Sequence, residues 1–186
     1  CSLAALAKED HSVTPVCFEF NASRTYSLDP KWVGKEAAKL AFGALKPKSV
    51  ETKTTTVILT QFALQDLLAY TLVGAIKADS VQRNQSPFKG KIGEQVASEN
   101  LTICDDGLYP SGLRTALFDG EGVPHQKTPV IEKGILRNFL YDNYSANKDS
   151  KESTGNASRA GYLSTPSIDT TNFHIMPQKN APAQML

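Results

Sequence analysis

Two segments in the first half of the chain place apolar residues every three or four positions, which is the spacing of one helix face. The first runs from residue 30 to about residue 45, where Asp29 can cap the helix, Pro30 fits its first turn and Pro47 ends it. The second runs from about residue 61 to residue 78 and has a broader apolar face. The pattern therefore predicts two helices, the second of them largely buried.

Shorter segments that are β-branched or alternate apolar with polar residues predict strands. In the first half these are residues 16–20, residues 24–28, which we expect to pair with 16–20 across a turn, and residues 54–59. In the second half these are residues 101–104, 113–119, 128–132, 135–141 and 171–176.

Turn residues separate these strands and define one clear hairpin. Lys133 and Gly134 join residues 129–132 to Ile135 and Leu136, while residues 80–100 and 145–161 are polar and predict loops. The order of elements predicts an α+β fold, with helices in the first half and a β-rich second half. Its hairpins could build a curved or barrel-like sheet.

Charge and cysteine content exclude several classes of function. The 186 residues include 20 Lys and Arg against 19 Asp and Glu, a net charge of +1, which gives nucleic acid little to bind. No apolar run reaches the roughly 18–20 residues of a membrane span. Cys1, Cys17 and Cys104 form no C-x-x-C pair, so we expect free thiols, as in the cytoplasm, and no structural zinc site.

Three groups of residues offer candidate chemistry. The acidic turns Cys104-Asp105-Asp106-Gly107 and Phe118-Asp119-Gly120-Glu121-Gly122 could bind a cation or peptide amines, although Asp and Gly also build turns for conformational reasons alone. His125 follows the second turn and could form a hydrolytic group with Asp119 and Glu121, or lie in a surface turn. The segment Ser153-Thr154-Gly155-Asn156-Ala157-Ser158-Arg159 could hold an anion or a peptide terminus, since arginine can fork onto a carboxylate.

These motifs occur in a series that resembles the TldD/PmbA family. The series comprises Gly93-Glu94-Gln95-Val96-Ala97-Ser98, residues 101–107, residues 118–124, residues 130–136, residues 153–159 and residues 172–183. The last is similar to the family's N-x-x-I-x-P-G stretch, with Gln178 in place of Gly. The resemblance is strong from about Val57 to Leu186. It implies a cytoplasmic peptidase system, historically named for modulating DNA gyrase, that processes modified peptides and degrades unfolded polypeptides.

The resemblance also implies a domain organisation. Family members carry an additional α/β domain upstream and more β-structure downstream, so we expect this chain to be a fragment of a longer protein. Residues 1–100 would be the central α/β segment and residues 101–186 the β-rich part of the C-terminal domain, in one continuous structural unit.

One branch of the family, TldD, is similar to zinc metallopeptidases and carries His-Glu-x-x-x-His directly after a strand. Two imidazoles hold Zn²⁺ there and the glutamate activates the metal-bound water. After the matching residues 57–59, this chain has Thr60, Gln61 and Gln65. Amide oxygens bind zinc poorly, and glutamine cannot accept a proton from water. The family's later Cys ligand would lie beyond Leu186, so the chain resembles the PmbA branch, which pairs with TldD and lacks the metal site.

This assignment implies a non-catalytic subunit without a cofactor of its own, with zinc in a TldD-type partner, in a homo- or heterodimer. We expect it to bind unfolded or extended peptide by β-augmentation, without direct contact to nucleic acid or membrane. The motif residues expected to contribute are Gly93, Glu94, Asp105, Asp106, Asp119, Glu121, Gly122, Thr154, Gly155, Asn156 and Arg159. Two alternatives are a peptidase in its own right, with Asp119, Glu121 and His125 as candidate catalytic residues, and an unrelated peptide-binding β module.

Overall fold

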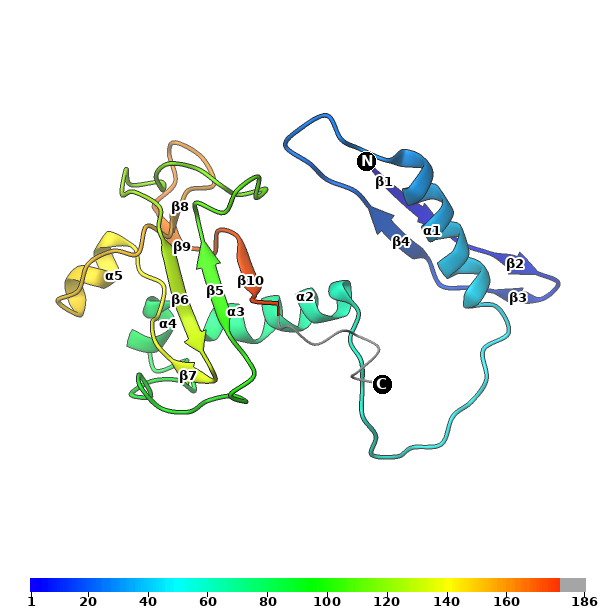
Figure 1. Ribbon diagram of the computed structural model, residues 1–186, viewed down its shortest axis with the longest axis horizontal. Helices are drawn as coiled ribbons and strands as arrows, with labels where there is room; N and C mark the ends of the chain where they lie inside the picture. The colour runs from blue at the N-terminus through cyan, green and yellow to red at the C-terminus, as the bar shows by residue number, and fades with distance from the viewer. Residues whose placement is uncertain (178–186) are drawn as a thin grey trace. The chain divides into compact units, whose positions relative to one another are not determined.

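The computed structural model of the protein describes residues 1–177, and the chain divides into two compact units, Cys1–Ile58 and Leu59–Leu186 (Figure 1). The division falls at residue 58, whereas the sequence pattern changes character near residue 100. Gln178, which replaces the expected glycine of the last motif, lies outside the described residues.

The first unit packs one helix on a small sheet. β1 (Ser2–Ala5) and β4 (Cys17–Phe20) pair antiparallel, and between them β2 (Lys8–Glu9) and β3 (Ser12–Val13) form a hairpin. The helix α1 (Pro30–Gly43) packs against β1 and β4. Its start confirms the prediction, since the Asp29 side chain accepts a hydrogen bond from the Trp32 backbone N–H at 2.9 Å.

Two strands predicted in this unit were wrong. Residues 24–28 form bends, because the hydroxyls of Ser23, Thr25 and Ser27 bond one another and hold the chain in a turn. β4 pairs instead with β1, a strand that the hydropathy pattern did not predict. Residues 54–59 are extended but form no strand, because no described strand lies beside them to complete a ladder of hydrogen bonds.

Three helices replace the single long helix predicted at the start of the second unit. They are α2 (Gln61–Tyr70), α3 (Leu72–Ala75) and α4 (Ala78–Gln82). The first break falls at Thr71, whose hydroxyl donates to the Leu67 carbonyl, and the second at Lys77, whose extended backbone bridges to Leu140. α2 has no fully buried residue, so the prediction of a largely buried helix fails for its first ten residues.

A four-stranded antiparallel sheet forms the centre of the second unit. Its order is β10 (Phe173–Ile175), β5 (Ile103–Asp106), β6 (Lys127–Glu132) and β7 (Ile135–Leu136). The predicted hairpin is confirmed: Lys133 and Gly134 both have positive φ, 48° and 77°, as a type I′ turn requires. The α+β class is confirmed. Among the described residues the sheet is open, with β10 and β7 at its ends, and does not close on itself.

The remaining differences concern loops. Residues 113–119 form no strand apart from an isolated bridge between Phe118 and Pro124, because their amides bond to nearby turns. The strand predicted over 135–141 ends at Leu136, where the Arg137 amide turns back to the Val130 carbonyl. The predicted loop 145–161 contains most of α5 (Asn143–Lys148) and β8 (Ala157–Ser158), which pairs with β9 (Ser167–Ile168).

An apolar core lies against the sheet of the second unit and fixes the ends of its strands. Its fully buried members include Ile76, Ile103, Val130, Leu136 and Leu140. Through residues 1–177, none of the helices combines the length and hydrophobicity that crossing a membrane requires.

Candidate functional site

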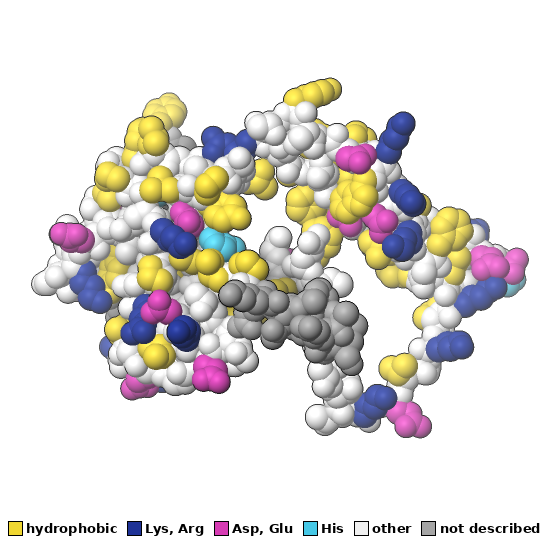
Figure 2. Space-filling view, viewed as in Figure 1, with side chains coloured by type: hydrophobic (Ala, Val, Ile, Leu, Met, Phe, Trp, Pro, Cys, Tyr) yellow, Lys and Arg dark blue, Asp and Glu magenta, His cyan; other side chains and the backbone are white. Residues whose placement is uncertain are grey.

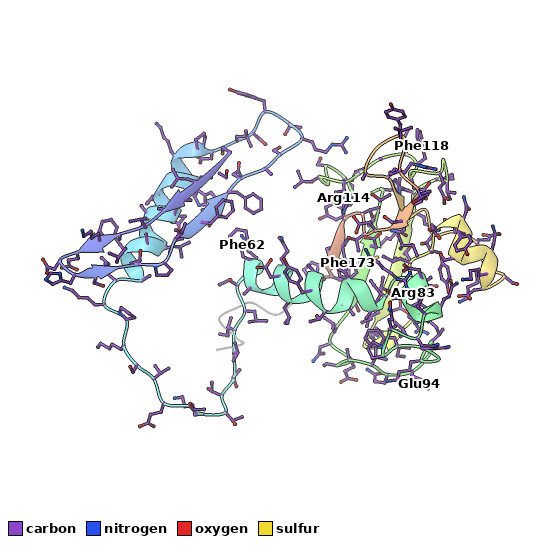
Figure 3. All side chains as sticks on the ribbon, turned by 180° about the vertical axis from the view of Figure 1, so that it is seen from behind. Phe62, Arg83, Glu94, Arg114, Phe118 and Phe173 are labelled. Atoms are coloured by element: carbon purple, nitrogen blue, oxygen red, sulfur yellow. The ribbon has the colours of Figure 1, made fainter. Side chains whose placement is uncertain are left out.

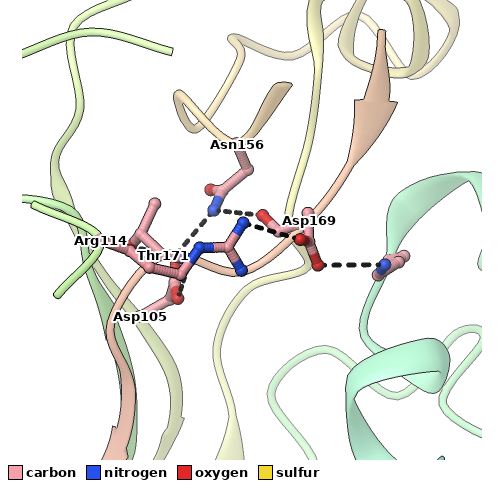
Figure 4. Close-up of polar contacts among 6 residues, drawn as sticks. Asp105, Arg114, Asn156, Asp169 and Thr171 are labelled. Atoms are coloured by element: carbon pink, nitrogen blue, oxygen red, sulfur yellow. Dashed lines mark hydrogen bonds and ion pairs between the residues drawn. The ribbon is translucent and has the colours of Figure 1, made fainter. Parts of the chain in front are cut away.

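A buried carboxylate at the end of β5 joins three distant segments of the second unit. Asp105 is only 1% exposed. Its Oδ1 accepts from the Thr171 backbone N–H at 2.8 Å, and its Oδ2 accepts from the Thr171 hydroxyl at 2.9 Å and from Asn156 Nδ2 at 2.7 Å (Figure 4). Burial raises the pKa of Asp105, and the hydrogen bonds from Asn156 and Thr171 oppose that rise.

Asn156 completes this junction with every polar atom of its side chain engaged. Its Oδ1 accepts from the Thr154 hydroxyl at 2.6 Å, and its Nδ2 also donates to the Asp169 carbonyl at 3.0 Å. The preceding Gly155 has φ of +70°, and a Cβ at this position would lie 2.5 Å from the Pro124 carbonyl oxygen. The glycine at this position therefore allows the 153–159 segment to pack closely against the 124–125 backbone.

The Asp169 carboxylate forms ion pairs with two basic side chains beside this junction. Its Oδ2 lies 2.8 Å from Arg114 Nη2, and its Oδ1 lies 3.5 Å from Lys77 Nζ. Burial alone would raise the pKa of Asp169, but the hydrogen bond and charge of Arg114, with the Lys77 charge, outweigh burial and hold the pKa below its usual range. Both oxygens of this carboxylate are thus committed to the protein.

Asp119 fastens the second acidic turn to β8. Its Oδ1 accepts from the backbone N–H groups of Glu121 and Val123 at 2.9 and 3.0 Å, and its Oδ2 accepts from the Ala157 N–H at 2.9 Å. Arg159 reaches back across this junction and donates from Nε to the Gly120 carbonyl at 2.8 Å. The Asp and Gly residues of this motif therefore form a turn that is tied to a second loop.

His125 lies between two glycine-containing loops. A Cβ at Gly107 would lie 2.6 Å from the His125 Cβ, and one at Gly155 would lie 3.2 Å from its Cα. Its Nδ1 is buried and has no hydrogen-bond partner among the described residues. Gly107 therefore leaves the space that the His125 side chain occupies, and Gly155 leaves space for the backbone at residues 124 and 125.

These groups surround a cavity of about 240 Å³ within the second unit. Arg114 lies near the same end of the unit as Phe118, as Figure 3 shows. The residues that line the cavity are Arg114, Phe118, Asp119, Gly120, His125, Asn156, Ala157, Ser158, Arg159, Asp169, Thr170 and Thr171.

The structure brings only some of the sequence candidates to this cavity. Those that line it are Asp119, His125, Asn156 and Arg159, and those that hydrogen-bond or pack behind it are Asp105, Thr154 and Gly155. Gly93 and Glu94 bond Leu136 through their backbones, and Glu94 lies at the other end of the unit from Phe118 (Figure 3). Asp106 caps its own turn by accepting from the Leu108 N–H at 3.0 Å, and Gly122 has φ of +81° in the next turn.

The candidate hydrolytic group does not assemble. Asp119 and His125 both line the cavity, but the Asp119 oxygens accept three backbone hydrogen bonds. Glu121 is outside the lining, and its Oε2 accepts from the Asn143 N–H at the start of α5 at 2.9 Å. Among residues 1–177, no hydrogen bond or ion pair joins these three side chains into the kind of acid–base relay that a nucleophilic hydrolase uses.

Sequence reasoning missed Arg114, Asp169, Thr171 and Lys77. Arg114 was placed in a predicted strand, and its ionic partner Asp169 is 55 residues away. No local pattern identifies such a pair, because each residue taken alone is an ordinary surface charge. The Thr171–Asp105 bond spans 66 residues and carried no local signal either.

The three positions that match the family's zinc motif lie at the start of α2. Thr60 is the N-cap residue, with its hydroxyl 3.5 Å from the Ala63 N–H, and Gln61 and Gln65 are exposed one turn apart. A hydroxyl and two neutral amides do not fit zinc, which binds imidazole, thiolate and carboxylate. Within residues 1–177, no group of three or more His, Cys, Asp or Glu side chains is arranged to hold a metal ion.

Residues 52–186 match the model of the PmbA/TldA metallopeptidase C-terminal domain. The chain is 46% identical to the uncharacterized protein MJ0231 of Methanocaldococcus jannaschii over 154 residues, which are 83% of this chain and 36% of that protein. The chain spans about a third of the length of the curated relatives it matches.

Two solved structures share the fold. A protein of Thermotoga maritima described as a candidate modulator of a DNA gyrase superposes with a TM-score of 0.86 and 32% identity, over 97% of this chain and 40% of that one. TldE from Thermococcus kodakarensis superposes with a TM-score of 0.83 and 28% identity, over 99% of this chain and 42% of that one.

Proposed function

Because the chain belongs to the PmbA/TldD metallopeptidase family, we propose that it is part of a PmbA-type subunit that supports peptide cleavage without supplying zinc ligands itself. In this proposal a TldD-type partner holds the zinc and cleaves the peptide, and the two subunits assemble in the cytoplasm. The subunit described here contributes to the binding and presentation of an unfolded or extended peptide.

One observation carries the proposal: the chemistry of the residues at the start of α2. Where the family's zinc-binding branch has His-Glu-x-x-x-His, this chain has Thr60, Gln61 and Gln65. Thr60 is used as a helix cap, and the two glutamine side chains point from an exposed helix surface. A glutamine at the position of the glutamate cannot act as the general base that activates water.

The edge of the sheet supports peptide binding. β10 is the end strand of the four-stranded sheet, and its residues are only half-buried. An end strand can accept an extended peptide through main-chain hydrogen bonds, which depend little on side-chain identity. Similarity to the protein named TldE is consistent with a subunit of this kind.

The proposal is tested by cleavage assays with the full-length protein, a TldD-type partner and both together, using an unfolded polypeptide as substrate. We expect cleavage by the pair and none by this subunit alone. The variants Gln61→Ala and Gln65→Ala should leave cleavage by the pair unchanged, whereas replacing the histidines of the partner's motif should abolish it. Loss of cleavage on Gln61→Ala, or cleavage by this subunit alone, would overturn the proposal.

A further inference from the structure

We propose that the cavity beside β8 binds the C-terminal carboxylate of an extended peptide, an inference that rests on the proposed role in peptide binding. The cavity lies at the end of the sheet where Thr171 leads into β10, and Thr171 itself lines the cavity. A carboxylate that entered there would meet the guanidinium groups of Arg114 and Arg159.

The hydrogen bonds of the lining residues leave guanidinium donors available for a ligand. The two carboxylates of the lining are engaged by the protein: Asp119 accepts three backbone N–H groups, and both oxygens of Asp169 are paired with cationic side chains. The guanidinium groups are only partly engaged. Nε and Nη1 of Arg114 and Nη2 of Arg159 donate to no residue in the described part of the chain. A site whose carboxylates are already paired, and whose guanidinium N–H groups are available, favours an anionic ligand. A carboxylate fits because its two oxygens can accept two parallel hydrogen bonds from one guanidinium group.

Hydrogen bonds within the protein hold the site in place before any ligand binds. Asp105 and Asn156 fasten the 153–159 and 169–171 segments to β5, and Asp119 fastens the 118–124 turn to β8. Arg114 is oriented by Asp169, and Arg159 by the Gly120 carbonyl. Donors that are already oriented lose little conformational entropy when a ligand binds.

The direction of β10 favours the C-terminal carboxylate of a peptide over a side-chain carboxylate. A peptide that adds antiparallel to β10 runs opposite to Phe173–Ile175, so its C-terminal end lies at the N-terminal end of β10. That end adjoins Thr171 and therefore the cavity. Antiparallel pairing would thus bring a free C-terminus to the two arginines.

The rim of the cavity suits an apolar residue beside that terminus. Phe118 lines the cavity and is 62% exposed, and Leu117 beside it is 79% exposed. The 161–164 turn, whose Ser164 carbonyl accepts a hydrogen bond from Arg159, presents Tyr162 and Leu163 almost fully exposed. Apolar side chains stand out at the end of the second unit where these loops lie (Figure 2). We therefore expect the ligand's last residues to be apolar.

The test compares three acetylated hexapeptides by isothermal titration calorimetry with the full-length protein. The first is an apolar sequence with a free C-terminal acid, the second is the same sequence as its C-terminal amide, and the third is that amide with one internal residue replaced by Glu. We expect the acid to bind about tenfold more tightly than either amide. The variant Arg114→Gln should abolish this preference. Arg137→Gln, which removes an exposed arginine paired with Glu132 outside the cavity, should retain it.

Equal binding of acid and amide would overturn the inference while leaving peptide binding, and so the proposed function, intact. Tight binding of the internal-Glu amide would overturn the assignment to the C-terminus, and failure of all three peptides to bind would overturn the site. If Arg114→Gln does not fold, NMR of the Nε–H groups in the unaltered protein replaces it. The acid peptide should shift the signals of Arg114 and Arg159 and leave that of Arg137 in place.

Discussion

The start of α2 and the junction around Asp105 use polar side chains in opposite ways. Thr60 and Gln65 are exposed, and the hydrogen bonds that Thr60 accepts come from Ala63 and Leu64 in the same helix. Asp105 and Asn156 are buried and bond segments 51 to 66 residues apart. The position at which the family's catalytic motif stands is therefore an ordinary helix start here, whereas the buried polar groups lie at the cavity.

This difference indicates where substitutions should matter. Removing a buried partner leaves the remaining polar groups without water or hydrogen bonds, whereas an exposed side chain exchanges one set of hydrogen bonds for another with solvent. The two regions should therefore differ by several kcal/mol in their sensitivity to truncation.

The largest effect is expected for Asp105→Ala. It leaves the Thr171 N–H, the Thr171 hydroxyl and an Asn156 N–H without their acceptor, and we expect a loss of about 3–5 kcal/mol in the free energy of unfolding. Urea unfolding followed by circular dichroism measures this loss. Glu132→Ala, which removes an exposed pair with Arg137, is the control and should cost under about 0.5 kcal/mol. Equal losses for the two variants would contradict the comparison.

Gly155→Ala comes next. The positive φ of Gly155 and the 2.5 Å approach of a Cβ to the Pro124 carbonyl predict a loss of about 2–3 kcal/mol. Gly161 provides a matched control, because nothing lies within 4 Å of a Cβ there and Gly161→Ala should change stability by less than about 0.5 kcal/mol. Similar melting temperatures for the two alanine variants would show that the 153–159 segment does not need its close packing.

The effect of Asp169→Asn on stability should depend on pH, because the ion pairs at the cavity require an ionised carboxylate. The pKa of Asp169 is lowered in the folded protein, so its carboxylate stabilises the fold at pH above its ordinary value of 3.8, and this contribution is lost as the pH falls through the folded pKa. The stability difference between the unaltered protein and Asp169→Asn should therefore be present at pH 7 and shrink below about pH 4. Urea unfolding at several pH values measures it, and a difference that grew toward low pH would contradict the assignment of the ion pairs.

The smallest effects are expected at the start of α2. Thr60→Ala removes a helix cap with a long hydrogen bond and should cost about 0.5–1 kcal/mol. Gln65→Ala leaves an exposed helical position and should change stability by less than about 0.5 kcal/mol. A loss above about 2 kcal/mol at Gln65, measured by urea unfolding, would show that this side chain has a structural role.

Local sequence signals predicted those parts of the fold that local chemistry determines. Asp29 with Pro30 fixed the start of α1, and the Lys133-Gly134 pair predicted the β6–β7 hairpin, because caps and tight turns depend on a few adjacent residues. Residues 54–59 and 113–119 have strand-like composition but no strand, because a strand also needs a neighbour that composition does not reveal. The start of α5 did carry a readable signal, since Asp142 and Ser145 form a capping box.

The candidate site was also predicted only in part, because the sequence reveals contacts between adjacent residues and not those between distant ones. Turn chemistry was one interpretation of the motifs with Asp105 and Asp119, and the segment with Asn156 was a candidate anion or peptide-terminus site. In the structure these residues build turns and junctions at the cavity. Arg114 and Asp169 were missed, because their pairing exists only after folding brings together residues 55 positions apart.

The central claim is that this subunit supplies no zinc ligand at the family's motif. The measurement that tests it most directly is the zinc content of the purified full-length protein and of its TldD-type partner, by elemental analysis after dialysis. We predict close to one zinc per chain in the partner and far below one in this protein, unchanged in the Gln61→Ala variant. Close to one zinc per chain in this protein would contradict the claim and favour the alternative that it is a peptidase in its own right.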